Sequence, residues 1–149
     1  MAMKKGILFS LLILAFLLCA NLTYGIAEQN RLKIEVIYFH ATIRCESCLL
    51  IERQTRETIE QVYSTNLKDG TLSFSSLDFQ DEQKSELAER YEIDSQTLIV
   101  QISNGSKVIK WKKLEKIWEY MNNYEKFRKY IVEEINEYLK EVKNAESKN

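Results

Sequence analysis

A strand pattern gives way to a helix pattern within a few residues of the sequence, and this junction limits the folds open to the chain. Residues 34–39 are a run of apolar and β-branched side chains that predicts a mostly buried strand. Residues 46–63 then carry apolar side chains at spacings of three and four, which predicts an amphipathic helix. A buried strand that leads directly into such a helix is typical of an α/β fold.

Strand and helix patterns continue to alternate after this junction. The predicted elements are strands at 71–79 and 97–102, a helix at 82–91 with Asp81 as its N-cap, and a hairpin strand at 107–111 after Asn104 and Gly105. The alternation predicts one α/β domain over residues 31–142, followed by a polar tail at 143–149.

The last third of the domain predicts two helices. Apolar side chains keep a helical period from residue 114 to residue 142, with a break at Asn122 and Asn123 between a short helix and a long one. Trp118 and Ile131 lie on this apolar stripe. We therefore expect both side chains to be buried against the sheet.

Residues 1–25 have the pattern of a secretory signal peptide. Lys4 and Lys5 precede an apolar run at 6–20, which is shorter than the ~20 residues of a typical membrane span. An uncleaved N-terminal anchor is the alternative, and only that alternative places this protein in a membrane. In both cases we expect an exported domain that is periplasmic, extracellular or anchored on the outer face of the cytoplasmic membrane.

Composition and charge exclude several classes of protein. The 149 residues are 45% apolar, as in a globular domain. With 21 basic and 22 acidic side chains the net charge is −1, so no broad positive surface indicates a nucleic acid as partner. Three cysteines are too few for a dense disulfide scaffold.

Cys45 and Cys48 lie where the first predicted strand meets the first predicted helix. A thiolate at a helix N-terminus is stabilised by unpaired backbone N–H groups and by the positive end of the helix dipole, which lowers its pKa from about 8.5. The two residues between the cysteines let Cys48, one turn inside the helix, meet Cys45 as its disulfide partner. This spacing predicts Cys45 as the exposed nucleophile and Cys48 as the resolving thiol.

Three neighbouring residues are candidate modulators of this pair. The positive charge of Arg44 favours the Cys45 thiolate, whereas the negative charge of Glu46 opposes it. His40, five residues before Cys45, is either a locally hydrogen-bonded residue at the end of a strand or a proton-transfer group.

Two other roles for the cysteines stay open. A zinc site usually needs two such cysteine pairs, and here only His40 could add a ligand. A purely structural disulfide over so short a loop would constrain the unfolded chain little. We prefer a redox role, for which neither a metal nor a cofactor is expected because the sulfur atoms carry the chemistry.

The stretches 34–48 and 91–100, with a helix, a strand and a helix between them, resemble the thioredoxin fold over residues 31–142. Residues 102–118 are similar to a small exported thioredoxin-like family named as a nitrophenyl compound nitroreductase subunit. The resemblance implies a three-layer α/β sandwich in which helices flank a mixed sheet of four or five strands, with a long C-terminal helix. It also implies Cys45 as nucleophile, Cys48 as resolving thiol and a disulfide between them.

The sequence departs from the thioredoxin pattern at three positions. The usual cis-proline falls at Ser95 or Gln96, and since the chain contains no proline we expect a trans bond there, with Gln96 as a fourth candidate modulator. The usual buried acid falls near Tyr38, and the usual tryptophan before the first cysteine is replaced by Arg44.

These departures favour thiol–disulfide exchange with one dedicated protein partner, itself exported or membrane-bound, over general reductase activity. The alternative is a non-catalytic accessory subunit, associated with a nitroreductase, or a metal-binding module on the same fold.

The export pattern makes a direct prediction. N-terminal sequencing of the exported protein should find a first residue near Ile26 or Glu28, because signal cleavage follows small residues at this spacing. An intact Met1 in the membrane fraction would instead indicate the uncleaved anchor.

Overall fold

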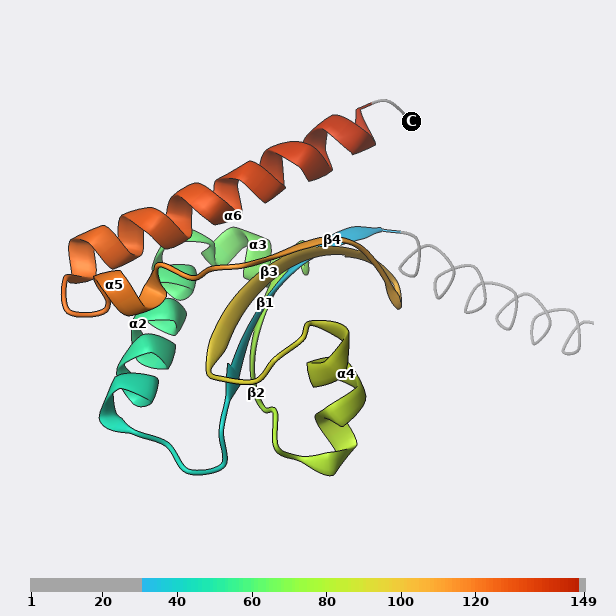
Figure 1. Ribbon diagram of the computed structural model, residues 1–149. Helices are drawn as coiled ribbons and strands as arrows, with labels where there is room; N and C mark the ends of the chain where they lie inside the picture. Colours follow the sequence, from blue (N-terminus) through green and yellow to red (C-terminus); the bar gives the residue numbers. More distant parts are fainter. Residues whose placement is uncertain (1–30, 148–149) are drawn as a thin grey trace, which may run out of the picture. The chain divides into compact units, whose positions relative to one another are not determined.

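Four strands and their flanking helices make up residues 31–147, the part of the chain that the computed structural model describes (Figure 1). The predicted signal at 1–25 lies outside this part. In chain order the elements are β1 (Leu32–His40), α2 (Glu46–Val62), α3 (Ser64–Lys68), β2 (Leu72–Asp78), the 3-10 turn η1 (Glu82–Lys84), α4 (Ser85–Arg90), β3 (Thr97–Asn104), β4 (Lys107–Lys113), α5 (Ile117–Tyr120) and α6 (Tyr124–Glu146).

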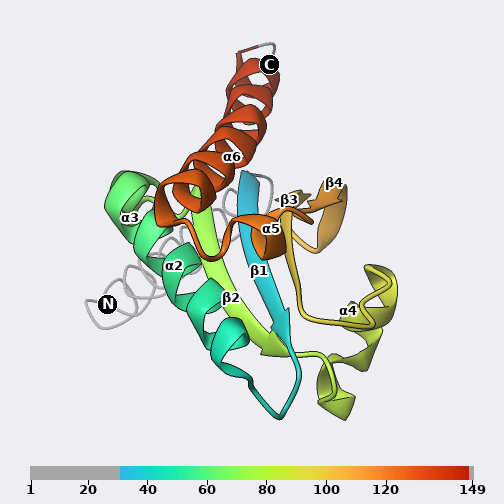
Figure 2. The same ribbon diagram turned by 60° about the vertical axis from the view of Figure 1, so that its left-hand side comes forward.

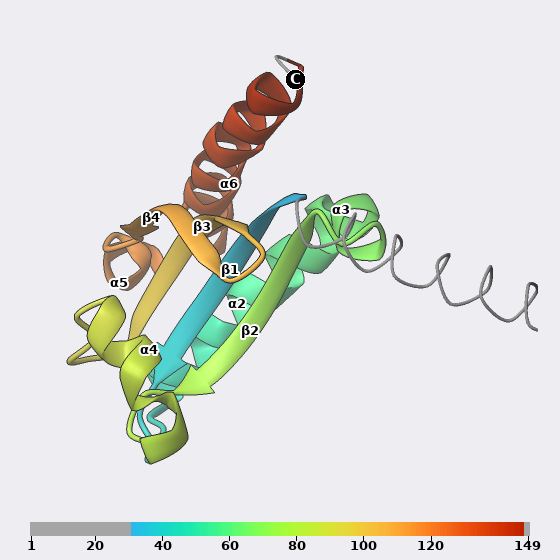
Figure 3. The ribbon, with the colours of Figure 1, turned by 90° about the vertical axis from the view of Figure 1, so that its right-hand side faces the viewer.

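The strands form one mixed sheet in the order β2-β1-β3-β4, seen face-on in Figure 3. Strands β1 and β2 are parallel, with Val36 opposite Phe74. Strands β1 and β3 are antiparallel, and β3 and β4 form an antiparallel hairpin. The parallel pair needs a crossover connection, which α2 and α3 supply.

Helices cover both faces of the sheet. Helices α2 and α6 pack on one face, and α4 lies over the other (Figure 2). The period of two along β1 sends Ile34 and Val36 toward α2 and α6, and sends Ile37 and Phe39 toward α4. Strand β1 is therefore buried on both faces, as its uninterrupted apolar run predicts.

This arrangement confirms the thioredoxin-like α/β fold. The sheet is mixed, helices flank it, and a long helix of 23 residues ends the domain. Within residues 31–147 the sheet has four strands rather than five. The break between the two C-terminal helices is also confirmed, because Asn123 caps α6 by accepting a hydrogen bond from the Lys126 N–H at 3.1 Å.

The start of α4 and the position of the hairpin turn differ from the sequence prediction, and β3 and β4 each extend two residues further than predicted. Asp81 caps the 3-10 turn η1, where it accepts from the Gln83 N–H at 3.0 Å, and α4 begins only at Ser85. The hairpin turn lies one residue later than predicted, because Asn104 pairs with Lys107 and leaves Gly105 and Ser106 as the two turn residues. Gly105 has a φ of +59°, which a two-residue turn with glycine first requires.

The prediction that Trp118 is buried is wrong, whereas Ile131 is fully buried. Trp118 is 41% exposed and Ile131 is 0% exposed. Helix α5 is a single turn, and its first residue, Ile117, takes the inward position at 1% exposure. The next residue lies about 100° further round the helix, so its side chain points outward.

Among the helices of residues 31–147, none combines the length and the apolar character that crossing a membrane requires. Helix α6 continues through Glu146, into the segment for which the sequence predicts a polar tail. Val142 is the last buried apolar residue on that helix.

The core makes a stability prediction. Ile131→Ala should lower the free energy of unfolding by about 2–5 kcal/mol, because it removes a fully buried side chain and leaves a cavity. Ile109→Ala is the matched control: this isoleucine on β4 is 54% exposed, and its loss should cost under about 1 kcal/mol. Urea unfolding measures both, and equal losses would contradict the placement of α6 on the sheet.

Candidate functional site

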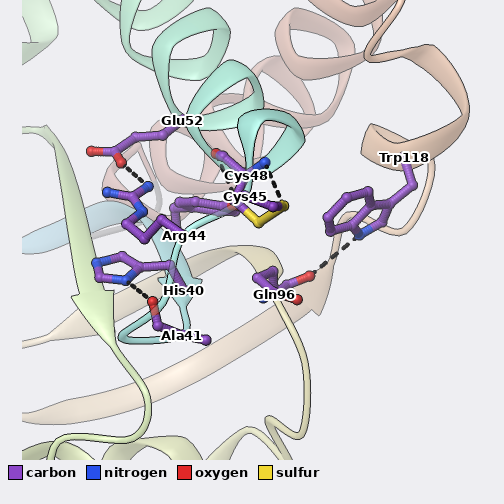
Figure 4. Close-up of a disulfide and its surroundings, with 9 residues drawn as sticks. His40, Ala41, Arg44, Cys45, Cys48, Glu52, Gln96 and Trp118 are labelled. Carbon is purple, nitrogen blue, oxygen red and sulfur yellow. Dashed lines mark hydrogen bonds and ion pairs between the residues drawn. A yellow bond between two sulfur atoms is a disulfide. The ribbon is translucent and has the colours of Figure 1, made fainter.

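A disulfide joins Cys45 and Cys48 at the start of α2, with 5.1 Å between their Cα atoms (Figure 4). Cys45 is the N-cap residue, and its Sγ accepts a hydrogen bond from the Cys48 N–H at 3.2 Å. The sulfur therefore occupies the place where a capping oxygen usually satisfies one of the free N–H groups of a helix. Negative charge at this position is stabilised by the same groups.

The loop between β1 and α2 is tied to the end of β2. The Thr42 hydroxyl donates to the Asp78 carboxylate at 2.7 Å, and the Thr42 N–H donates to the Gln80 side-chain oxygen at 2.9 Å. The hydrogen bond from the Thr42 hydroxyl is the main cause that lowers the pKa of Asp78, and a second hydrogen bond from the Gln80 backbone N–H lowers it further. The loop holds Cys45 at the same end of the sheet as the ends of β1 and β2.

The two cysteines differ in accessibility. Cys45 is exposed, whereas Cys48 is 1% exposed and faces the core between α2 and the sheet. An external sulfur atom can therefore reach Cys45 but not Cys48 without a change in structure. The difference follows from the place of each residue along α2. Cys45 caps the open end of the helix, whereas Cys48, three residues later, lies almost one turn inside it.

Tyr38 is the buried polar group behind Cys48. Its hydroxyl donates to the Cys48 carbonyl oxygen at 3.2 Å. Burial raises the pKa of Tyr38 to about 12, with a smaller opposing effect of Arg44. The hydroxyl is therefore neutral at ordinary pH, so it anchors α2 to β1 and is not a base for the Cys48 thiol. The sequence indicates only that Tyr38 stands where thioredoxins carry an acid; its contact with Cys48 is new.

Arg44 lies beside Cys45 in the chain, but its guanidinium points away from the disulfide (Figure 4). It forms an ion pair with Glu52 on α2. Glu52 was not among the residues that the sequence predicted for the site. The i,i+4 pairing of Glu52 with Arg56 was visible in the sequence, but nothing local joins Glu52 to Arg44.

The other two predicted modulators, His40 and Glu46, lie at the end of β1 and at the start of α2. The Nδ1–H of His40 donates to the Ala41 carbonyl at 3.0 Å, which is the local hydrogen bond expected of a strand-end histidine. Glu46 is the exposed first residue of α2, where the helix dipole favours a carboxylate.

Gln96 and Trp118 lie on the opposite side of the disulfide from Arg44 (Figure 4). The Trp118 indole N–H donates to the Gln96 carbonyl at 3.3 Å. Both residues line a hollow of about 250 Å³, whose walls also include Asp94, Ser95, Leu114 and Ile117. No peptide bond in residues 31–147 is cis, so the backbone at Gln96 is trans.

Trp118, like Glu52, was not predicted for the site. Its spacing fits the apolar stripe of a helix, but its 41% exposure and its contact with Gln96 distinguish it from a core residue. Within the described residues no group of three or more histidine, cysteine, aspartate or glutamate side chains is placed to bind one metal ion.

No protein family model matches this chain, and no curated protein does so either. The sequence resemblance to the nitroreductase-associated family therefore has no support from these comparisons.

Several solved structures are similar to this chain at low identity. Thioredoxin O2 of Arabidopsis thaliana in the oxidised state is 16% identical over 64% of this chain and 76% of its own, with a TM-score of 0.39. Deadhead, a germline-specific thioredoxin of Drosophila melanogaster, is 20% identical over 72% of this chain and 92% of its own, with a TM-score of 0.41. Human ERp44 is 16% identical over 66% of this chain but only 26% of its own, with a TM-score of 0.44.

These TM-scores all lie below 0.5, so the fold assignment rests on the order and direction of the strands described above.

The Tyr38 contact predicts a pH-dependent loss of stability. Tyr38→Phe should lower the free energy of unfolding at pH 7 by about 0.5–1.5 kcal/mol, the value of one buried hydrogen bond. Tyr38 ionises near pH 12 when folded and near pH 10 when unfolded, so its contribution is present below pH 10 and is lost as the pH rises toward 12.

Urea unfolding at several pH values between 7 and 12 measures both effects. The Phe variant should lose less stability than the parent between pH 10 and pH 12, and parallel curves for the two proteins would contradict the burial of the Tyr38 hydroxyl.

Proposed function

We propose that this protein exchanges thiols and disulfides with a protein partner through Cys45 and Cys48. One observation carries the proposal: the disulfide lies at the N-terminus of α2 with Cys45 exposed and Cys48 buried. A disulfide with only a structural role gains nothing from an exposed sulfur at a helix N-terminus. A reactive pair needs one sulfur that a partner can reach and one that is protected until the mixed disulfide forms.

The exchange reaction balances with the partner's two thiols alone. A partner thiolate attacks the Cys45 sulfur, which forms a mixed disulfide and releases Cys48 as a thiolate that takes up a proton. The partner's second thiol, once deprotonated, attacks the partner sulfur that is bonded to Cys45. This step closes the partner disulfide and releases Cys45 as a thiolate. The Cys45–Cys48 disulfide is then reduced by two electrons, and the partner dithiol is oxidised to a disulfide. The reverse sequence reduces a partner disulfide.

The helix terminus favours Cys45 in both directions of this reaction. When Cys45 attacks, the N–H groups at the start of α2 stabilise its thiolate form. When Cys45 leaves, they stabilise the same negative charge as it develops. The chemistry uses sulfur atoms and backbone N–H groups, so the proposed reaction uses no cofactor.

The surroundings of Cys45 support a protein as the partner. Three large apolar side chains close to the pair in sequence or in space are exposed: Ile43 at 87%, Leu49 at 50% and Trp118 at 41%. Exposed apolar side chains next to a reactive group are typical of a surface that another protein covers. Trp118 is held in place by its bond to Gln96 and offers a rigid aromatic contact.

We further propose that the protein acts outside the cytoplasm, with an exported or membrane-bound partner. The support is the signal-like pattern at 1–25.

A second candidate is a non-catalytic accessory subunit, such as one associated with a nitroreductase. Two observations favour it: the Tyr38 hydroxyl cannot act as a base for Cys48, and the charge of Arg44 is neutralised by Glu52. In this case the exposed apolar residues would hold a permanent partner and Cys45 would not react.

A trapping experiment separates the two candidates. In Cys48→Ala the resolving thiol is absent, so a mixed disulfide between Cys45 and the partner should accumulate in non-reducing gels of cells that express the variant. Reduction should release the partner for identification by mass spectrometry.

The control is Cys45→Ala, which retains the buried Cys48 and should trap nothing. Equal trapping by both variants, or none by either while the partner co-purifies without a covalent bond, would favour the accessory subunit.

A further inference from the structure

Glu52 lies between two arginine side chains on the flank of α2. One of its carboxylate oxygens pairs with the Arg44 guanidinium, and the other accepts from Arg56 at 3.1 Å. Arg44 and Glu52 are both largely covered, with 23% and 16% of their side chains exposed, whereas Arg56 is 48% exposed. The Arg44–Glu52 pair is therefore less screened by water than a surface ion pair.

Glu52 stays ionised at neutral pH. Burial by itself would raise the pKa of this carboxyl group, but the hydrogen bonds from Arg44 and Arg56 outweigh burial and leave the pKa below its usual value. The pair with Arg44 therefore persists over the pH range in which a cysteine titrates.

The pair determines where the charge of Arg44 lies. Arg44 directly precedes Cys45, so an unconstrained guanidinium could approach the sulfur. Figure 4 shows the side chain turned instead toward Glu52, on the side of α2 away from the disulfide. The phenyl ring of Phe74 lies under Arg56 at 4.9 Å, which limits the movement of that second arginine as well.

Other charged groups face Arg44 from the neighbouring strands. Asp78 at the end of β2 lies within electrostatic range of both Arg44 and His40, the last residue of β1. Tyr38 on β1 is also in range but is neutral at ordinary pH. Glu46, the first residue of α2, is exposed. The guanidinium of Arg44 forms its ion pair with Glu52 on α2.

We propose that Glu52 is a positioning residue of the exchange site: it holds the Arg44 guanidinium against α2 and so keeps that positive charge from stabilising the Cys45 thiolate. The inference rests on the proposed function, since it concerns the same sulfur. A thiolate that is less stabilised is more nucleophilic, and the dithiol form is less favoured at equilibrium. Glu52 thereby shifts the Cys45–Cys48 pair toward the role of a reductant.

The test is the pH dependence of Cys45 alkylation in the reduced protein. In Glu52→Gln the amide keeps the size of the side chain but loses its charge, so Arg44 is released and the alkylation midpoint should fall by about half a pH unit, the effect of one extra charge at moderate distance. Iodoacetamide is the probe, and mass spectrometry assigns the modified cysteine. Glu57→Gln, an exposed glutamate of the same helix, is the control with the same change in net charge and should leave the midpoint unmoved.

A double-mutant cycle tests whether Glu52 acts through Arg44. Arg44→Gln alone should move the midpoint little, since the charge it removes is already held away from Cys45. In the Arg44→Gln background, Glu52→Gln should produce less than half of its effect in the parent. Equal shifts in both backgrounds, or no shift in the parent, would overturn the proposal.

A second variant keeps the proposal testable if Glu52→Gln does not fold. If circular dichroism shows that Glu52→Gln is unfolded, Glu52→Asp takes its place. This variant keeps the charge but is one methylene too short to hold Arg44, so the midpoint should fall in the same direction by a smaller amount, and an unchanged midpoint would count against the proposal.

The assay needs no partner protein, so its outcome is independent of the trapping experiment. A shifted midpoint without a trapped partner would reject the proposed function alone, and a trapped partner without a shift would reject the role of Glu52 alone.

Discussion

Strand β1 is buried on both faces and paired on both edges, and the position of the disulfide depends on it. Ile34 and Val36 contact the core under α2 and α6, while Ile37 and Phe39 contact the cluster under α4. Hydrogen bonds to β2 and β3 fix its register on either side. Because α2 begins soon after β1 ends, the N-terminus of that helix is carried to one end of the sheet together with Cys45.

The depth of each sulfur atom follows from this junction. Cys45 is the cap and stays at the surface, whereas Cys48 lies in the contact between α2 and β1. Tyr38 supports that contact from the strand by a hydrogen bond to a backbone carbonyl rather than to sulfur. The arrangement leaves the protonation of Cys48 without a nearby carboxylate on β1, which is the clearest chemical difference from the thioredoxin pattern that the sequence resembles.

Charges near Cys45 are arranged by contacts across elements. Arg44 is adjacent to Cys45 in the chain, but a largely covered carboxylate on α2 is a stronger partner for its guanidinium than an exposed sulfur surrounded by water. On the other side, Trp118 contacts the loop at Gln96 from a helix that follows β4. The two sides of the disulfide therefore differ. The largely covered Arg44–Glu52 ion pair lies on one side, and on the other Trp118 and Gln96 line a hollow.

The sequence alone was sufficient for features that depend on neighbouring residues. The buried run at 34–39, the break at Asn122 and Asn123, and the cysteine pair at the start of the first helix all depend on local periodicity and helix-terminus chemistry, which operate within one or two turns. The exposure of Trp118, the Tyr38 contact and the pairing of Arg44 with Glu52 were decided by the tertiary structure. Each of these depends on the angle at which one element meets another, and no local pattern encodes that angle.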